Sequence, residues 1–453
     1  MSQLRSFDMP TRTARDRKSL RDVVVGASIG TTLEWFDFGL YGILAALVFP
    51  HVFFPDSSSA TGLMASLAIF GIGLAARPLG AVLFANFGDR VGRRPILVIT
   101  LSLMGAASLG IAVLPGYESI GLAAPVLLMV LRMVQGFSLG GESSAAQVMV
   151  IEYAEPRNRG FMGSLVNVGS PLGQVMITLS VVCVRAVVGE AAFESWAWRV
   201  LFAAGALMAV AGFVIRRRVD ETPVYKQAVE VGAKTRMPML EVVRRQPREI
   251  MRLAVIGASG TAVNYVVYTY SVSYITKNLG MSSEVSFWLL FVLSAVGVAL
   301  VPVGGWLADR IGRKPVVFLD LGVGLVGICV YFPLLDTMSW PLMLVGMLLT
   351  VGVHWLGFGA WGAFIAEPFP TATRYSGHAA TYTLTNLVAG APAPLIAAYA
   401  LEATGTTWSL TFLLALVYVL GIVCAIRSRE TLGVSFHPHD REKKQTEEVQ
   451  ELR

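Results

Sequence analysis

Charged residues are scarce in this chain of 453 residues: Asp, Glu, Lys and Arg make up 15% of it, whereas hydrophobic residues make up 55%. In soluble globular domains about a quarter of the residues are charged, so this composition excludes an ordinary soluble protein. The mean hydropathy of +0.63 points the same way. The sequence therefore predicts a membrane protein.

Residues that serve catalysis and metal binding are also few, with three Cys and five His. Cys183, Cys329 and Cys424 stand singly inside apolar runs, without the spacing of a metal site or a redox pair. We find no nucleophile spaced with a base and no phosphate-binding loop. The net charge of +6 comes from short clusters between apolar runs, not from a basic face. We therefore expect no metal, no cofactor, no nucleic-acid partner and no enzyme activity.

Twelve apolar segments, each of roughly 20 residues or more, are long enough to cross a lipid bilayer. Their predicted ranges are 22–48, 61–86, 96–114, 122–151, 161–187, 197–216, 251–276, 284–307, 316–335, 340–366, 375–400 and 407–427. The predicted secondary structure is therefore helical throughout the membrane.

A short polar segment occurs twice, as FGDRVGRRP at 87–95 and as LADRIGRKP at 307–315. In each copy an Asp and an Arg end one apolar run, a glycine permits a tight turn, and a basic pair with a proline begins the next run. Two copies about half a chain apart indicate duplicated bundles, as in many transporters. We predict an all-α membrane protein with twelve transmembrane helices in two pseudosymmetric six-helix bundles.

Lys and Arg gather in the leader and in the loops after the second, fourth, eighth and tenth segments, and the opposite loops are mainly acidic. The positive-inside rule then places both termini in the cytoplasm, in a multi-pass protein of the plasma (inner) membrane. The predicted parts are a basic leader at 1–21, an N-terminal bundle at 22–216, a cytoplasmic linker at 217–250, a C-terminal bundle at 251–427 and a tail at 428–453. For the tail we expect a solvated end.

The first segment carries ionisable side chains at membrane depth. Glu34 lies twelve residues past Asp22, hence roughly 18 Å into the membrane. Glu34, Asp37 and Tyr41 share one helix face. Because acids at this depth face a watery path or one another, we predict that Glu34 and Asp37 carry the proton as a coupled pair. The alternative is a structural bond to a neighbouring helix or a helix kink.

Two arginines lie at similar depth in other segments. Arg132 is predicted to meet a substrate carboxylate or the two acids, because a guanidinium offers bidentate geometry. Arg77 precedes Pro78, where a kink would free carbonyl groups for it, so a structural use of Arg77 stays open.

The fourth segment adds further candidates beside Arg132. Arg132, Gly136 and Gly140 follow a four-residue step that favours close helix contact. Gln135 and Glu142 belong to an adjoining stripe, and we expect Gln135 to contact the substrate and Glu142 to take part in proton coupling.

The remaining substrate candidates are polar side chains in the membrane segments: Tyr41, Asn167, Gln174, Asn264, Tyr268 and His354. With Arg77 and Arg132 they suit an organic acid with hydroxyls or a ring. His354 stands alone among apolar residues, which favours a packed, hydrogen-bonding role over a titrating one. A quaternary ammonium substrate would instead need an aromatic cage with an acid, which Trp35, Phe36, Tyr41 and Tyr268 would partly supply.

Five motifs in order resemble the metabolite:proton symporter branch of the major facilitator superfamily: GTTLEWFDFGLYG, FGDRVGRRP, RMVQGFSLGGE, LADRIGRKP and EPFPTATRYSG. That branch includes carriers of 2-oxoglutarate, citrate, shikimate, and proline or betaine. The resemblance implies that two bundles rock about a central path lined by Glu34, Asp37 and Arg132. It also implies a cytoplasmic gate built from Asp89, Arg90, Arg93, Asp309, Arg310, Arg313, Glu367 and Arg374.

The function predicted from sequence is proton-coupled uptake of a small organic acid, either a di- or tricarboxylate or a cyclic or aromatic carboxylate, by a monomer working through alternating access. The partners expected are a small-molecule substrate, protons and the lipid bilayer. One alternative is proton-coupled uptake of a zwitterionic osmolyte such as proline or betaine. The other is export of drugs or metabolites by proton antiport, which the glycines and proline at 163–173 favour.

Overall fold

The computed structural model describes residues 14–91, 93–140, 143–216, 238–370 and 373–434. Within them, the N-terminal half forms six spans, several of which consist of two helices end to end. These are α1 (Ala14–Leu47); α3 (Ser59–Ala75) with α4 (Arg77–Val91); α5 (Arg93–Val113); α7 (Ala123–Leu139) with α8 (Ser143–Tyr153); α9 (Arg159–Asn167) with α10 (Gly169–Val188); and α12 (Trp198–Arg216). Short helices α2 (Phe49–Phe53), α6 (Tyr117–Ile120), α11 (Glu190–Ala192) and η1 (Phe193–Ala197) connect them.

The C-terminal half repeats this arrangement after α14 (Pro238–Arg245), and three of its spans contain π-helical turns. The seventh span is α15 (Pro247–Tyr265), η2 (Val266–Tyr270), α16 (Ser271–Ser273) and η3 (Tyr274–Asn278). The others are α17 (Ser283–Ile311); α18 (Arg313–Asp336); α19 (Trp340–Met347), η4 (Leu348–Gly352) and α20 (Val353–Ala366); α21 (Arg374–Thr385), η5 (Asn386–Gly390) and α22 (Ala393–Thr404); and α23 (Trp408–Ile426).

The described residues thus confirm the twelve predicted spans, with ends that differ by a few residues. The largest difference is at α1, which begins at Ala14 and not at 22. The second span changes from α3 to α4 at Ala76, just before Pro78, because proline lacks an N–H and its ring disturbs the preceding turn. Residues 1–13 of the predicted leader, 217–237 of the predicted linker and 435–453 of the predicted tail lie outside the described residues.

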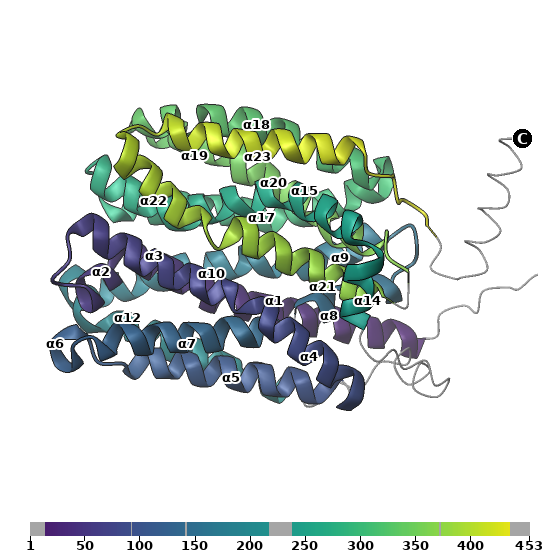
Figure 1. The fold of residues 1–453 in the computed structure, drawn as a ribbon, viewed down its shortest axis with the longest axis horizontal. Helices are drawn as coiled ribbons and strands as arrows, with labels where there is room; N and C mark the ends of the chain where they lie inside the picture. The colour runs from purple at the N-terminus through teal and green to yellow at the C-terminus, as the bar shows by residue number, and fades with distance from the viewer. Residues whose placement is uncertain (1–13, 92, 141–142, 217–237, 371–372, 435–453) are drawn as a thin grey trace, which may run out of the picture.

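The two halves lie against each other along their length. In Figure 1 the purple and blue N-terminal helices occupy the lower half and the green and yellow C-terminal helices the upper half. Helices α9 and α10 pack against α17, α20 packs against α9, and α1 reaches η2 and α16. Residues between these contacts are therefore enclosed by both bundles.

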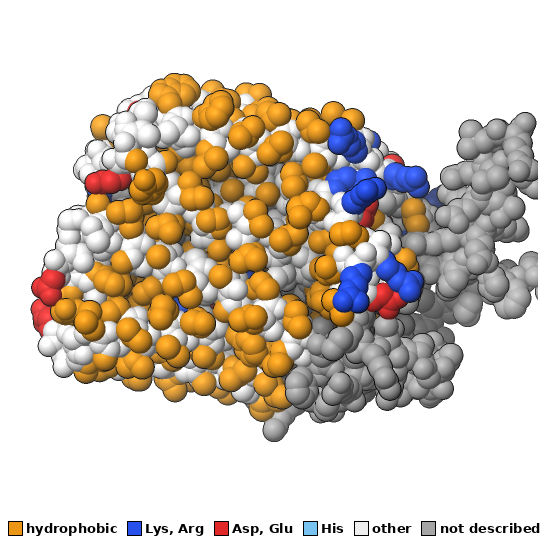
Figure 2. All heavy atoms as spheres, in the orientation of Figure 1, with side chains coloured by type: hydrophobic (Ala, Val, Ile, Leu, Met, Phe, Trp, Pro, Cys, Tyr) orange, Lys and Arg blue, Asp and Glu red, His pale blue; other side chains and the backbone are white. Residues whose placement is uncertain are grey.

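The outer surface is a broad apolar band. Figure 2 shows hydrophobic side chains over the middle of the molecule, Lys and Arg together with a few Asp and Glu at one end, and Asp and Glu at the other. Leu79, Leu207 and Phe412 are among the large apolar side chains left exposed. Among the residues that the structure describes, eight helical stretches are long and apolar enough to cross a membrane, and further apolar helices are shorter. The surface suits lipid on all sides and water at both ends.

Glycines bring the second and fourth spans into contact, as the stripe in the fourth segment predicts. A Cβ on Gly136 would lie 1.7 Å from the Gly73 carbonyl oxygen, and one on Gly140 would lie 2.2 Å from that of Arg77. Any side chain there would force the helices apart. The close approach places Arg132 beside the α3–α4 junction.

Candidate functional site

Glu34 of α1 forms an ion pair with Arg77 of α4. The Arg77 Nη2 lies 3.2 Å from the Glu34 Oε1, and the two side chains are 5% and 3% exposed. The Arg77 guanidinium also lies near the Tyr382 hydroxyl on α21 and stacks over the Phe38 ring at 4.7 Å. One guanidinium therefore pairs with an acid of its own bundle and lies near a hydroxyl of the other bundle.

Asp37, one turn along α1, belongs to a different network. The Ser108 hydroxyl and the Gln135 amide donate to its two oxygens, each at 2.5 Å. The Arg132 Nη1 donates to the Gln135 Oε1 at 2.7 Å. Gln135 therefore bridges Arg132 and Asp37, and the network holds α1, α5 and α7 together inside the N-terminal bundle.

Arg132 is wholly buried among aromatic rings. Its guanidinium carbon lies 4.2 Å from the ring centre of Phe38, 3.9 Å from that of Tyr41 and 5.6 Å from that of Phe70. Such stacking stabilises a desolvated cation. Arg132 and Tyr41 therefore lie behind the wall of the central space and not on it.

Two small cavities each have a volume of ≈ 30 Å³. One is lined by residues of both bundles, and the other mainly by residues of the C-terminal bundle. Each has room for about one or two water molecules. We call the first the interbundle cavity; its lining includes Glu34, Asn167, Ser170, His378 and Tyr382. We call the second the C-bundle cavity; its lining includes Asn264, Tyr265, Asp320, His354 and Asn386. Trp35, Phe358, Trp361 and Tyr382 line both, so the cavities adjoin.

The predicted substrate residues divide between these walls and the packed interior. Asn264 is buried in the wall of the C-bundle cavity, and neither end of its amide has a hydrogen-bond partner among the described residues. The Asn167 amide donates to the Phe358 carbonyl across the bundles at 2.7 Å. Gln174 is buried between α10 and α1, beside Gly39. Tyr268 is bonded to Ser294 at 2.7 Å, which gives it a packing position.

The C-bundle cavity contains an acid that the sequence reasoning missed. Asp320 of α18 lies with its Oδ2 3.2 Å from the His354 Nδ1 of α20. His354 is thus paired and not alone among apolar residues. The signal was available, because Asp320 is an isolated acid inside an apolar run, and that is the criterion that selected Glu34.

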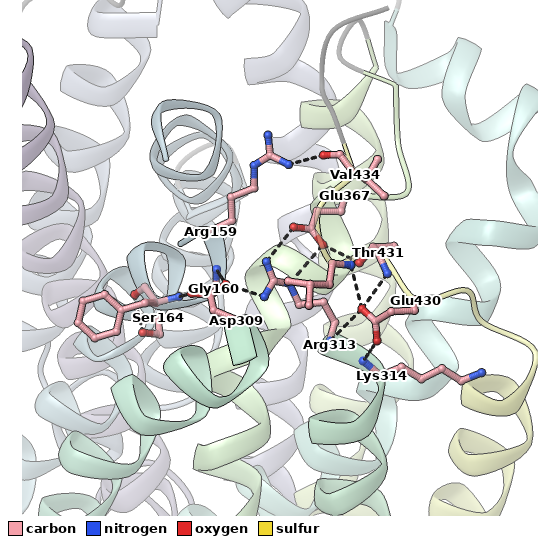
Figure 3. A network of polar contacts seen from close by, with 12 residues as sticks. Arg159, Gly160, Ser164, Asp309, Arg313, Lys314, Glu367, Glu430, Thr431 and Val434 are labelled. Carbon is pink, nitrogen blue, oxygen red and sulfur yellow. Dashed lines mark hydrogen bonds and ion pairs between the residues drawn. The ribbon is translucent and has the colours of Figure 1, made fainter. Parts of the chain in front are cut away.

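At the end rich in Lys and Arg, Asp309 of α17 joins the two bundles (Figure 3). Its carboxylate accepts from the backbone N–H groups of Gly160 at 2.9 Å and Phe161 at 2.7 Å, at the N-terminus of α9. It also pairs with Arg313 at 2.6 Å. A helix N-terminus favours an anion, so this contact closes the end of the path between α9 and α17.

Arg313 links Asp309 to Glu367 at the end of α20. Its Nε and Nη2 donate to the two Glu367 oxygens at 3.3 Å and 3.1 Å. An ion pair between the two bundles joins Arg374 to Glu152 at 2.9 Å. Of the predicted gate residues, Asp309, Arg313, Glu367 and Arg374 therefore meet at this end.

The other predicted gate residues are not in this network as described. Arg310 is exposed and stacks on Trp306 at 4.9 Å. The side chains of the gate residues Asp89, Arg90 and Arg93 lie outside the described part of the structure. So does the whole of Glu142, the residue expected to take part in proton coupling.

The first residues of the tail cross this network, and the expectation of a solvated end is wrong for them. Glu430 accepts from the backbone N–H groups of Arg313 and Lys314, both at 3.0 Å. The Thr431 hydroxyl donates to Glu367 at 2.5 Å, and Arg159 of the N-terminal bundle donates to the Val434 carbonyl at 2.6 Å. Residues 428–434 therefore strap the two bundles together (Figure 3).

The contacts of the strap at 428–434 change the pKa of Glu430. Partial burial acts to raise that pKa, but the backbone N–H groups of Arg313, Leu432, Lys314 and Thr431 stabilise the carboxylate. The net pKa of Glu430 lies below its ordinary value.

Contacts also join the bundles at the opposite end. Arg185 of α10 donates to the Ser283 hydroxyl of α17 at 2.7 Å, and Lys277 donates to the Ser59 hydroxyl at 3.2 Å. The described parts of the two bundles therefore contact each other at both ends, with the two small cavities between those ends.

Comparison with known proteins gives consistent matches. A family model described as Major Facilitator Superfamily matches residues 27–394. The chain is 33% identical over 429 residues to a proline/betaine transporter of Escherichia coli (strain K12), covering 92% of this chain and 85% of that protein. It is 32% identical over 392 residues to a shikimate transporter of the same strain, covering 86% and 89%. The solved structure of the proton:xylose symporter XylE shares the fold, with a TM-score of 0.73 at 17% identity over 93% of this chain and 98% of that one.

Proposed function

The chain belongs to the Major Facilitator Superfamily and is a multi-pass membrane transporter of the secondary type, and we propose that it takes up a small organic acid together with protons by alternating access. We further propose that it lies in the inner membrane as a monomer, with both termini in the cytoplasm. The relatives' own substrates differ, one being named for proline and betaine and the other for shikimate. The case for a substrate therefore rests on the site.

The observation that carries the proposal is the ion pair of Glu34 with Arg77 at the edge of the interbundle cavity. A proton on Glu34 removes an anionic partner from Arg77. A substrate carboxylate can then take that place and make charge-assisted hydrogen bonds to the guanidinium. Proton and substrate carboxylate bind together because each makes room for the other.

Tyr382 connects this exchange to the movement of the bundles. Arg77 reaches Tyr382 of the C-terminal bundle while it holds Glu34 of the N-terminal one. A substrate bound to Arg77 therefore lies between the bundles and changes the contact that Arg77 makes across them. This differential contact is what a ligand needs in order to shift a conformational equilibrium.

The network of Asp309, Arg313, Glu367 and the strap at 428–434 is the proposed cytoplasmic gate. Breaking it requires Asp309 to leave the N-terminus of α9 and Arg159 to leave Val434. Both contacts are polar and exchangeable with water, so they can open and close repeatedly. The contacts of Arg185 and Lys277 would form the outer gate.

A specific observation favours a second candidate, proton-coupled uptake of a zwitterionic osmolyte. Six aromatic side chains line the C-bundle cavity: Trp35, Tyr265, Trp355, Phe358, Trp361 and Tyr382. Asp320 lies on the same wall. Aromatic faces beside an acid are the chemistry that binds quaternary ammonium groups. Of the cage residues expected from sequence, Trp35 takes part, whereas Phe36 and Tyr41 are buried in the N-terminal bundle.

The test is a proton-flux and uptake screen of purified protein in liposomes. The panel contains shikimate, citrate, 2-oxoglutarate, L-proline and glycine betaine, each with and without an inward proton gradient. We expect one carboxylate compound to accumulate with the gradient and to lose accumulation with an uncoupler. Uptake of the acids supports the first candidate and uptake of betaine or proline the second. Substrate efflux driven by the same gradient would show antiport and contradict both.

The aromatic wall gives a matched test between the two candidates. Trp361→Leu removes a ring from both cavities while keeping an apolar side chain. The apparent affinity for glycine betaine should fall about tenfold if the ring faces an ammonium group, since a desolvated cation–π contact is worth about 1–2 kcal/mol. Trp408→Leu, at an exposed position, is the control.

A further inference from the structure

Asp320 is an acid at membrane depth whose partner, His354, carries no permanent positive charge. Among the described residues, no Lys or Arg lines the C-bundle cavity, and the hydrogen-bond partner of the Asp320 Oδ2 is the His354 imidazole. The Asp320 Oδ1 is buried without a partner in the described chain. This differs from Glu34, which faces a permanent cation in Arg77.

Two glycines create the space that the pair occupies. A Cβ on Gly260 would lie 2.1 Å from the His354 Nδ1, and one on Gly357 would lie 2.3 Å from the Asp320 Oδ2. Both glycines line the same cavity. The pair therefore fills space that a glycine of α15 and a glycine of α20 leave open for it.

The groups that face the pair are polar but uncharged or weakly acidic. They are Asn264 and Tyr265 of α15, Tyr382 of α21, Asn386 of η5 and Tyr418 of α23. Trp35 of α1 closes the cavity on the side of the N-terminal bundle. The nearest acid of the adjoining cavity is Glu34. None of the facing side chains supplies a permanent positive charge.

We propose that Asp320 and His354 form a second proton-binding site, which carries one proton through the transport cycle in addition to the proton of Glu34. This inference rests on the proposed function. An ionised Asp at membrane depth is costly, and one shared proton makes the pair neutral overall, either as carboxylate with imidazolium or as carboxylic acid with imidazole. The proton binds as the pair forms its neutral state and leaves as a hydrated proton when the cavity opens to water.

The arrangement also gives the imidazole a defined direction. Asp320 engages Nδ1, so the remaining ring nitrogen, Nε2, is the one left for the cavity and for a substrate acid. A substrate between the bundles would then meet Arg77 from the N-terminal side and the protonated pair from the C-terminal side. Asp320 thus shares the proton and also orients the imidazole.

The experiment measures protons carried per substrate in liposomes, from the membrane potential that stops net flux at a set substrate gradient. The probe is the compound of the panel above with the largest proton-driven uptake. The double variant Asp320→Asn with His354→Asn keeps two polar side chains of similar reach but cannot share an ionisable proton. We expect it to carry one proton fewer than the natural protein. Asp336→Asn, at the other end of α18 where the Tyr274 hydroxyl donates to Asp336, is the matched control and should leave the ratio unchanged.

The failures are distinguishable. If Glu34→Gln carries one proton fewer but the double variant keeps the natural ratio, the second site does not exist and the proposed function stands. If no compound of the panel shows proton-driven uptake, the proposed function fails and this inference with it. Should the double variant not insert, the alternative double variant Asp320→Asn with His354→Gln is measured in the same way, because neither amide can carry the proton. A ratio unchanged in that variant would overturn the proposal.

Discussion

Glu34 and Arg77 face each other across 3.2 Å inside the membrane, from neighbouring spans of one bundle. Their pairing neutralises two charges that would each be costly alone. It also means that neither can change its charge without consequence for the other. The proposed coupling of proton and substrate depends on this one relationship.

The first prediction concerns Glu34→Gln. The amide cannot carry a proton, so we expect substrate exchange to continue while each substrate carries one proton fewer. The limiting accumulation should then fall about tenfold for each unit of imposed pH gradient. Labelled-substrate uptake and counterflow in the same liposomes measure both quantities. Glu402→Gln, at an exposed position on α22, should match the natural protein.

The second prediction concerns Arg77→Lys. Lysine keeps the charge but loses the planar fork that reaches Glu34, Tyr382 and a carboxylate together. The KM for a carboxylate substrate should rise on the order of tenfold, the value of one charge-assisted hydrogen bond. The concentration dependence of counterflow checks it. Arg248→Lys, at an exposed position on α15, should leave KM near its natural value, and equal effects at both positions would argue against a substrate role for Arg77.

The third prediction concerns the cytoplasmic gate. Asp309→Asn loses the charge that pairs with Arg313 and one of the two acceptors for the N-terminus of α9. The gate should open more often, which would expose Ser164, a buried residue on α9 against Gly305. In a protein without native cysteines, alkylation of Ser164→Cys should become several-fold faster. The exposed change Asp56→Asn is the control, and an unchanged rate in Asp309→Asn would remove this carboxylate from the gate.

The fourth prediction concerns pH and the strap. The pKa of Glu430 is depressed in the folded protein, so its contribution to stability is present above the ordinary value of 4.5 and is lost as the pH falls through the depressed value. Glu430→Gln should therefore lower the melting temperature at pH 7, and the difference from the natural protein should shrink below pH 4.5. Thermal unfolding in detergent at both pH values measures it. A difference that grows on acidification has the wrong sign for this account.

Much of the fold follows from sequence because apolar length is a local property. The run at 340–366 matches α19 to α20, and the twin loops at 87–95 and 307–315 reveal the duplication. The π-helical turns were not predictable, since they depend on how each helix accommodates its neighbours. Nor was the strap, because Glu430 and Thr431 sit in a charged tail whose partners, Arg313 and Glu367, are distant in the chain.

The sequence predicts which residues belong to the site better than it predicts which of them pair with one another. Depth alone selected Glu34, Asp37, Arg77 and Arg132. Which acid meets which arginine depends on the rotation and tilt of packed helices, and the structure pairs Glu34 with Arg77 while Gln135 mediates between Asp37 and Arg132. The joint titration of Glu34 and Asp37 stays a prediction, now with separate partners for each acid. The same depth criterion would also have selected Asp320.

The most direct measurement is proton uptake on substrate binding by the purified natural protein in weakly buffered detergent, followed with a pH-sensitive dye. If a carboxylate substrate displaces Glu34 from Arg77, adding the transported compound should raise the pH, and Glu34→Gln should give a smaller rise at equal binding. An equal rise in both proteins, or substrate binding with no proton uptake in the natural one, would contradict the exchange of proton and carboxylate at this ion pair.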